Sequence, residues 1–242
     1  MESDKVVSWI REYFNQNGKG CKAIIGISGG ADSSVCAALL VKALGKENVI
    51  GVLMPKGIQH DIDVSNAVVN FLGIKHYVIN IEEPVNMLRE LIGKEMDNDP
   101  DSFDVYKTNT PARIRMTTLY GISAILGGRV CNTCNLSEDW VGYSTKFGDA
   151  AGDFSPISDF TKTEVRKLGH ELGLPNFIVE KTPEDGMSGK SDEEKLGFTY
   201  EVLDKYIREG ICEDTKIKEK IDRLHKMNLH KLQLMPKYER EK

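Results

Sequence analysis

The chain has 242 residues, a length that fits one α/β domain with an extended tail. Hydrophobic residues make up 40% and charged residues 29%, which excludes a disordered or fibrous protein. The formal net charge of −5 gives no general basic character, so we do not expect a nucleic-acid partner. No run approaches the ~20 apolar residues that cross a bilayer, and the N-terminus lacks a signal peptide's apolar core, so no membrane partner is expected.

Cysteine usage indicates a reducing compartment. The chain has five cysteines, an odd number with irregular spacing: Cys21, Cys36, Cys131, Cys134 and Cys212. Cys21 and Cys36 flank or lie within apolar segments. Such a set is typical of reduced thiols rather than of a disulfide framework, so we expect a cytoplasmic protein.

The first part of the chain alternates helices with strands. Helices are expected at residues 3–16, from a glycine turn to about 44, at 61–72 and at 83–92, and strands at 22–28, 49–54 and 77–81. The strand segments are apolar on both faces. Strands of this kind, alternating with helices, predict an α/β fold with a doubly wound parallel sheet and helices on both faces.

The second part of the chain mixes helices with long polar segments. The expected elements are a surface loop at 95–110, a helix at 111–126 opened by Pro111, a strand at 129–133, a loop at 136–160, a helix at 163–172, a loop at 181–192 and helices to about 231. A loop as long as 136–160 is uncommon in a compact domain unless it is functional. We find no internal repeat or linker, so residues 1–242 are expected to form one domain with a helical C-terminal region at about 199–242.

The motif Ser28-Gly29-Gly30-Ala31-Asp32-Ser33 follows a predicted strand and precedes a predicted helix. Two glycines let the backbone turn tightly, and the exposed N–H groups at the helix N-terminus form an anion site. Asp32 can only accept hydrogen bonds, so it suits a Mg²⁺ ligand better than a phosphate contact. Two glycines alone would fit a plain capped turn equally well, but the whole string in this context favours a phosphate loop.

Lys162 has an argument of its own. Thr161-Lys162-Thr163-Glu164 fits a capping box, which places Lys162 in the first turn of a helix. A cation there opposes the helix dipole by roughly 0.3–1 kcal/mol, and such a violation of a local rule often marks a functional site. The plain alternative is an exposed lysine whose charge water screens.

The S-G-G-x-D-S string resembles the loop of the ATP pyrophosphatases, which have the adenine nucleotide alpha hydrolase-like fold and cleave ATP between its α- and β-phosphates. Later motifs narrow the resemblance to NAD synthetase along nearly the entire chain. These motifs are Ala112–Met116, Thr133–Glu138, Tyr143–Asp149, Lys162–Val165, Lys181–Pro183, Leu196–Tyr200 and His230–Lys231.

The resemblance implies a ligase that acts on deamido-NAD. The nicotinate carboxylate attacks the α-phosphate of ATP and releases pyrophosphate, and ammonia then displaces AMP to give NAD. An ionised carboxylate is a poor electrophile, and adenylylation supplies it with a good leaving group. The chain has no room for a glutaminase domain, so we expect free ammonia, although a separate glutaminase subunit is left open. A homodimer is also implied.

The resemblance further implies roles for individual residues. ATP would be bound by Gly26, Ile27, Ser28, Gly29, Gly30, Ala31, Asp32, Ser33, Thr133 and Lys162. Mg²⁺ would be bound by Asp32 and Glu138, two carboxylates that suit a hard cation. Deamido-NAD would be bound by Arg113, Lys146, Asp153, His230 and Lys231, the last two typically across the dimer interface. Asp149 and Lys162 would be catalytic, with Asp149 accepting a proton from ammonia.

Two positions depart from the family pattern. Glu184 replaces a Ser or Thr that contacts ATP, and its charge would repel phosphate, so we do not expect it to bind ATP directly. Cys134 replaces a glycine and forms a C-x-x-C with Cys131, a spacing that some tRNA-thiolating pyrophosphatases use. Residues three apart in a strand point to opposite faces, which argues against that use. A non-catalytic ATP-binding module is the other alternative, but Asp32 and Glu138 argue against it.

Overall fold

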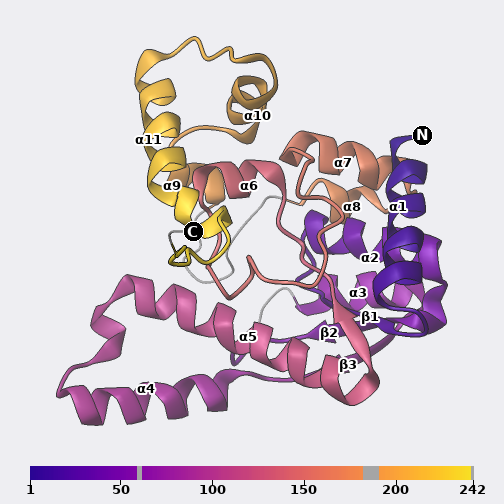
Figure 1. Ribbon diagram of the computed structural model, residues 1–242, viewed down its shortest axis with the longest axis horizontal. Helices are drawn as coiled ribbons and strands as arrows, with labels where there is room; N and C mark the ends of the chain where they lie inside the picture. Colours follow the sequence, from indigo (N-terminus) through magenta and orange to yellow (C-terminus); the bar gives the residue numbers. More distant parts are fainter. Residues whose placement is uncertain (59–61, 182–190, 241–242) are drawn as a thin grey trace.

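The computed structural model describes residues 1–58, 62–181 and 191–240 (Figure 1). Its centre is a four-stranded parallel sheet in the order β3-β2-β1-β4. The strands are β1 (Lys22–Gly26), β2 (Val49–Leu53), β3 (Lys75–Val78) and β4 (Gly128–Val130). Ala23 of β1 lies opposite Val49 of β2 on one side and Arg129 of β4 on the other. The strand order reverses beside β1, so the carboxyl ends of β1 and β4 flank a switch point, where open α/β sheets bind ligands.

Helices cover both faces of the sheet, as the sequence predicts. The helices of the first part are α1 (Glu2–Asn17), α2 (Ala31–Leu44), α3 (Ile62–Leu72), α4 (Glu82–Met96) and α5 (Asp104–Leu126). The chain continues through α6 (Leu136–Val141), α7 (Lys162–Glu171), α8 (Asn176–Val179), α9 (Asp192–Leu196), α10 (Tyr200–Glu209) and α11 (Thr215–Leu232). Short 3₁₀ turns lie at Lys46–Asn48 and Pro100–Ser102.

Two hydrophobic cores hold the sheet between these helices. One face packs β1 and β2 against α1, α2, α3, α7 and α8, through buried side chains such as Ile25 and Leu39. The other face packs Ile24 and Val52 against α4 and α5. Neighbouring residues of β1 and β2 are buried on opposite faces, so these two strands are apolar and could be recognised as parallel strands. The edge strand β3 is largely exposed and begins at Lys75, before the predicted strand at 77–81.

A third core lies apart from the sheet. Val141 of α6 packs with Leu203 of α10 and Ile221 of α11, and the completely buried side chains include both Leu203 and Ile221. Figure 1 shows α10 and α11 beside α6, away from the strands. The C-terminal helices thus pack against α6, the first helix after β4. No helix in the described part of the chain is long and apolar enough to span a membrane.

Several predicted boundaries are wrong. The polar segment predicted as a loop at 95–110 contains the start of α5, and Pro111 lies inside that helix. The first turn of α5 is exposed and therefore as polar as a loop. Its Lys107–Asp104 ion pair of 2.6 Å supports a helix all the same. The predicted loop at 136–160 likewise contains α6, and the predicted strand 129–133 leaves the sheet after Val130. The helical tail is divided into α9, α10 and α11 by turns at Gly197 and Gly210.

Candidate active site

The phosphate loop lies between the end of β1 and the start of α2, with Gly26 and Ile27 leading into it and Ala31 opening α2. Gly29 has a φ of +79°, and a Cβ there would come within 3.0 Å of Ser65 in α3. The Oγ atoms of Ser28 and Ser33 are 3.1 Å apart. Gly30 is the N-cap of α2 and has no side chain with which to cap the first-turn N–H groups. Those groups are therefore suited to an anion.

Three charged side chains meet beside this loop. Lys162 Nζ donates to Asp32 Oδ2 at 2.6 Å and to Glu138 Oε1 at 3.1 Å. The side chains of Lys162, Asp32 and Glu138 are 5%, 16% and 14% exposed. They lie in α7, α2 and α6, so the fold brings together three residues that are far apart in the sequence. We refer to Asp32, Glu138 and Lys162 as the charge cluster.

Burial and mutual attraction set the charges of this cluster. Burial raises the pKa of Glu138 to about 7, and the Lys162 ammonium opposes that shift. Burial acts to lower the pKa of Lys162, but the carboxylates of Asp32 and Glu138 outweigh it and raise that pKa. With all three groups ionised, two carboxylates face one ammonium. The excess negative charge favours a further cation.

The donor set of the charge cluster fits magnesium. Asp32 and Glu138 offer hard oxygen donors, and the Lys162 ammonium already places a positive charge between them. Across residues 1–58, 62–181 and 191–240, no group of three or more His, Cys, Asp or Glu could hold a metal ion. Mg²⁺ commonly uses one or two protein carboxylates and completes its octahedron with water and substrate phosphates. The cluster therefore suits Mg²⁺ that arrives with a nucleotide.

Asn135 is a site residue that sequence reasoning missed. It is fully buried, its Oδ1 accepts from Glu138 N at 3.0 Å, and its Nδ2 donates to Asp32 Oδ1 at 3.0 Å. One amide thus caps α6 and fixes the α2 carboxylate at the same time. The sequence held a signal for it, since Asn followed three residues later by Glu is an N-terminal helix pattern.

Asp149 lies in the loop after α6. Its Oδ1 accepts from Thr145 N at 2.8 Å, and its carbonyl accepts from Asn132 Nδ2 at 2.8 Å. Burial raises the pKa of Asp149, and the Thr145 N–H opposes that shift. Asn132 also receives the N–H of Cys134 at 2.9 Å, so it ties this loop to the turn after β4. Asp149 is consequently held in place with one oxygen already engaged.

Four of the predicted substrate residues also come together, near the end of α11. Arg113 Nε donates to the carbonyl of Lys146 at 3.3 Å, and Lys146 Nζ donates to the carbonyl of His230 at 2.6 Å. Lys231 Nζ donates to the carbonyls of Gly142 and Ser144 at 2.7 and 2.9 Å. We refer to Arg113, Lys146, His230 and Lys231 as the basic group. Its cations are bonded to backbone oxygens of their own chain.

Helix α11 uses one face to hold the end of α6. His225 Nδ1 lies 2.8 Å from the carbonyl of Trp140, and the two rings stack with centroids 4.1 Å apart. Asn228 Nδ2 donates to the carbonyl of Val141 at 3.1 Å. Gly142 has a φ of +70°, and a Cβ there would come within 2.1 Å of Asn228. With Lys231, these side chains satisfy the carbonyls that end α6, the helix that carries Glu138.

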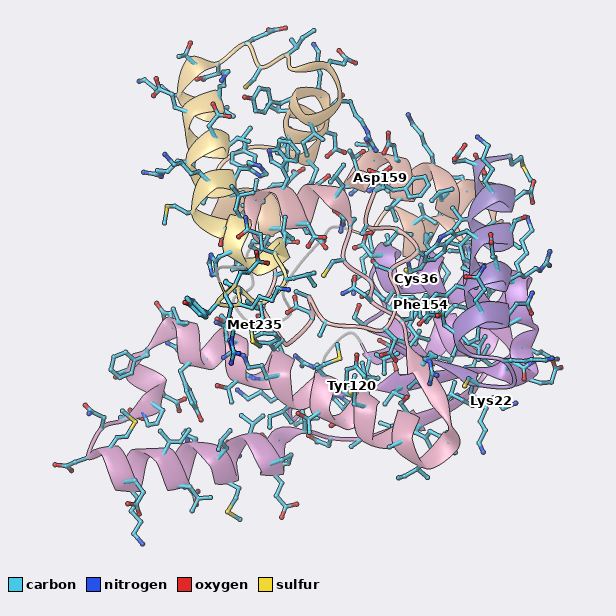
Figure 2. All side chains as sticks on the ribbon, in the orientation of Figure 1. Lys22, Cys36, Tyr120, Phe154, Asp159 and Met235 are labelled. Atoms are coloured by element: carbon cyan, nitrogen blue, oxygen red, sulfur yellow. The ribbon has the colours of Figure 1, made fainter. Side chains whose placement is uncertain are left out.

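Asp153 and Thr133 belong neither to the charge cluster nor to the basic group. Asp153 Oδ2 accepts from Val130 N at 2.7 Å, and Oδ1 accepts from the hydroxyl of Tyr120, labelled on α5 in Figure 2, at 3.2 Å. Both carboxylate oxygens of Asp153 are thus engaged with β4 and α5. Thr133 is half-buried in the turn after β4, between the sheet and α6. Glu184 lies outside the described residues.

The C-x-x-C pair does not form a sulfur-transfer site. Cys131 Sγ donates to the carbonyl of Asn132 at 3.2 Å, whereas Cys134 Sγ donates to the carbonyl of Asp149 at 3.3 Å. Both thiols are free and buried, and burial raises the pKa of Cys134 well above its usual value. A buried thiol with a raised pKa is a poor nucleophile.

Comparisons with known proteins identify the family of the chain. The NAD synthase family model matches residues 2–241. An NH(3)-dependent NAD(+) synthetase of Pyrococcus furiosus is 35% identical, covering 96% of this chain and 93% of the relative. A protein of the same name from Alkaliphilus metalliredigens is 37% identical, covering 98% of this chain and 97% of the relative.

Solved structures give the same result for the fold. The structure of NMN synthetase from Francisella tularensis is 32% identical with a TM-score of 0.86, covering 98% of this chain and 96% of that one. An NH3-dependent NAD synthetase from Campylobacter jejuni, in complex with the nitrate ion, is 26% identical with a TM-score of 0.78, covering 98% and 97%. The doubly wound fold and the predicted resemblance are thereby confirmed. The chain belongs to the NAD synthase family.

Proposed function

We propose that the charge cluster and the phosphate loop bind ATP with Mg²⁺, and that this NAD synthetase uses them to adenylylate the nicotinate carboxylate of deamido-NAD. Free ammonia then displaces AMP to give NAD. The observation that carries the proposal is the position of Lys162, whose buried ammonium lies against Asp32 and Glu138 beside the head of α2. Paired acids and a lysine at the end of a phosphate loop suit charge stabilisation during phosphoryl chemistry.

The chain's own groups divide this work between them. The first-turn N–H groups of α2, with Ser28 and Ser33, bind phosphate oxygens. Asp32 and Glu138 would hold Mg²⁺, which would neutralise phosphate charge. Lys162 would stay beside the two carboxylates, which use two of its three N–H donors, and would offer the third to a phosphate oxygen. Positioning the nicotinate oxygen in line with the α-phosphate supplies much of the remaining acceleration.

Asp149 accepts the proton that the attacking nitrogen loses. Its pKa is raised because it is buried, so it is a stronger base than an exposed carboxylate. Thr145 N donates to one carboxylate oxygen and Asn132 to the backbone carbonyl, so the other carboxylate oxygen would accept the proton. The basic group would bind the anionic dinucleotide. Asp153 would contact the same substrate only after releasing Val130 or Tyr120.

We further propose a homodimer in the cytoplasm. Helix α4 and the start of α5 project from the sheet in Figure 1 and expose Met87, Leu91, Met96, Phe103 and Val105. Large apolar side chains gathered on one projection favour an interface. The five free thiols suit a reducing compartment. Sedimentation of the protein with and without Leu91→Glu tests the dimer, and a wild-type monomer would contradict it.

The function is tested by mass detection of NAD after incubation with deamido-NAD, ATP, Mg²⁺ and ammonium. NAD, AMP and pyrophosphate should appear in equal amounts, and Lys162→Ala should mainly weaken the use of ATP. Pyrophosphate without deamido-NAD, or none under either condition, would contradict the proposal. The second outcome would favour a nucleotide-binding module without chemistry.

A second substrate is favoured by one comparison. The Francisella tularensis structure, 32% identical over 98% of this chain, carries the name NMN synthetase. That name points to a mononucleotide, which lacks the AMP half of the dinucleotide but has the same reacting end. Parallel assays with deamido-NAD and nicotinate mononucleotide therefore belong in the test. A higher kcat/KM for the mononucleotide would reassign the substrate without altering the chemistry.

A further inference from the structure

Asp204 is a buried carboxylate that the function described above does not use. It lies in α10, and the residue is 5% exposed. Its Oδ1 accepts from Ser137 Oγ at 2.5 Å, and its Oδ2 accepts from Thr163 N at 2.8 Å. Both oxygens are thus occupied by groups from two other helices. Buried carboxylates persist only where such partners compensate their lost hydration.

The two partners of Asp204 stand directly beside the charge cluster. Ser137 precedes Glu138 in α6, and Thr163 follows Lys162 in α7. Ser137 Oγ also accepts from Lys162 N at 2.9 Å. A continuous chain of hydrogen bonds therefore runs from Asp204 through the Ser137 hydroxyl to the backbone of Lys162. One carboxylate joins α10, α6 and α7 behind the site.

The charge of Asp204 also explains how Lys162 is tolerated at the start of a helix. A cation in the first turn opposes the helix dipole, whereas an anion there stabilises the helix. Asp204 supplies that anion by accepting the N–H of Thr163 in the first turn of α7. Arg208, one turn further along α10, holds the capping residue Glu164 with bonds of 3.0 and 2.6 Å. Helix α10 thus fixes the N-terminal turn of α7 through Asp204 and Arg208, which lie on one face of α10.

The same helix contacts the ammonium group itself. Lys162 Nζ lies 5.3 Å from the ring centroid of Tyr200, the first residue of α10. Tyr200 is 2% exposed, so its ring forms a dry wall behind the cation. The backbone of Lys162 is therefore held by Ser137, and its side chain is limited by Tyr200 and the two carboxylates. The long lysine side chain has little freedom left in this arrangement.

We propose that Asp204, acting through Ser137, is a positioning residue that fixes Lys162 relative to Glu138 and Asp32. The C-terminal helices complete the phosphate site in this way without touching the nucleotide. The inference rests on the proposed function in that Lys162 is taken to contact the ATP phosphates. It adds a role for α10 that the family's sequence motifs did not suggest.

The test compares Asp204→Asn and Ser137→Ala with a matched control. Asp204→Asn keeps the shape but removes the charge, and Ser137→Ala removes the bridging hydroxyl. Each should lower kcat and the affinity for ATP by about 10- to 100-fold, with KM for deamido-NAD unchanged. Asp222→Asn is the control, since Asp222 lies in the neighbouring helix α11 and bonds Tyr206 and Lys218 at the surface. It should change neither parameter.

A double-mutant cycle with Lys162→Met separates positioning from general stability. ATP·Mg²⁺ affinity is measured by calorimetry for the wild type, Lys162→Met, Ser137→Ala and the double variant, alongside thermal unfolding. If Asp204 and Ser137 act through Lys162, Ser137→Ala should have no further effect once Lys162 is gone. Independent, additive losses would overturn the proposal, as would loss of deamido-NAD binding to the same extent.

The binding readout keeps this inference separate from the proposed function. A wild-type protein that binds ATP but makes no NAD would refute the reaction, while the cycle would still report on Lys162. If Asp204→Asn fails to fold, Ser137→Ala carries the test alone, because it leaves the Asp204–Thr163 bond in place. A Ser137→Ala protein with wild-type ATP affinity and kcat would show that the chain of hydrogen bonds has no part in positioning.

Discussion

The charge cluster and the basic group are built in opposite ways. In the charge cluster, side chains from three elements bond one another, and Lys162 lies within 2.6 Å of Asp32. In the basic group, Lys146 and Lys231 donate to backbone carbonyls, and no carboxylate is among the partners of these bonds. The first arrangement is already charged and largely buried, so it is prepared for a charged ligand. Under the proposed function, the second would exchange backbone contacts for substrate contacts.

This difference predicts how much each half of the site must rearrange when its ligand binds. The charge cluster is already assembled around the Lys162 ammonium, so binding a nucleotide with its cation would require little rearrangement of these side chains. Withdrawing Lys231 from the end of α6 leaves two carbonyls without that donor. Substrate binding should therefore disturb the basic group and α6 more than ATP binding disturbs the charge cluster. The changes below break or sharpen this comparison.

Glu138→Gln should have the largest effect. The variant keeps the shape of the side chain but removes one of two carboxylates, and kcat/KM for ATP should fall by about 10²–10³-fold. Burial raises the pKa of Glu138 to about 7, so the ionised form is not the main source of stability. The thermal midpoint should accordingly stay the same or rise. Pyrophosphate release and thermal unfolding check both points, and near wild-type turnover would refute the metal assignment.

Asp149→Asn and Asp153→Asn separate two aspartates of one loop. Asp149→Asn removes the proposed proton acceptor and should lower kcat by about 10²-fold with little change in ATP affinity. Asp153→Asn should act mainly on stability, because its carboxylate bonds Val130 N and Tyr120 in the structure. We therefore expect a lower thermal midpoint for the second variant. If Asp153→Asn instead raises KM for deamido-NAD at unchanged stability, its predicted substrate contact is supported.

The sequence predicted those parts of the candidate site that local patterns mark. A glycine turn between an apolar strand and a helix identifies Ser28–Ser33 locally, and the capping box places Lys162 at the start of α7, as the structure confirms. Residues whose partners are distant were not predictable in this way. Asp204 stands in a helix with several other charged residues, and nothing local marks it as buried. Its place depends on the third core, which forms only when α10 and α11 pack against α6.

The basic group illustrates the same limit. The resemblance to NAD synthetase named Arg113, Lys146, His230 and Lys231, and the fold does bring them together. The resemblance did not show that α11 holds the C-terminal end of α6, because that contact depends on tertiary packing. The boundary of α5 was missed for a related reason, since a polar exposed helix and a polar loop have similar composition. The roles of the basic group in binding deamido-NAD stay predictions.

Lys231→Met should have an intermediate effect that differs from that of Lys146→Met. Lys231 lies close enough to Asp149 to lower its pKa, so removing the ammonium should raise the pKa of Asp149 further. The acidic limb of the kcat–pH profile should then move to higher pH. Lys146→Met should raise KM for deamido-NAD without moving that limb. Identical pH profiles for the two variants would show that the basic group acts as a uniform binding surface.

Glu164→Gln should have the smallest effect. Burial acts to raise the pKa of Glu164, but its bonds with Arg208 and Thr161 outweigh it, so that pKa lies below the usual value. As pH falls, Glu164 is protonated in the unfolded chain before it is protonated in the folded protein. The ionised residue therefore stabilises the fold above its unfolded pKa, and this contribution is lost as pH drops through its folded pKa. At neutral pH the variant's thermal midpoint should be about 1–3 °C lower, because the pair is partly exposed and is held by only a surface-type ion pair.

The Glu164 difference should shrink as the pH is lowered below 4.5, since the wild-type residue then becomes neutral too. Thermal scans of both proteins at several pH values down to the lowest at which the wild type stays folded measure this convergence. Arg208→Gln provides the control, because it removes the other partner of the same pair. A constant difference at every pH would mean that the glutamate acts by shape alone. In that case α10 would hold α7 chiefly through Asp204, and the charge cluster would depend on that one buried carboxylate.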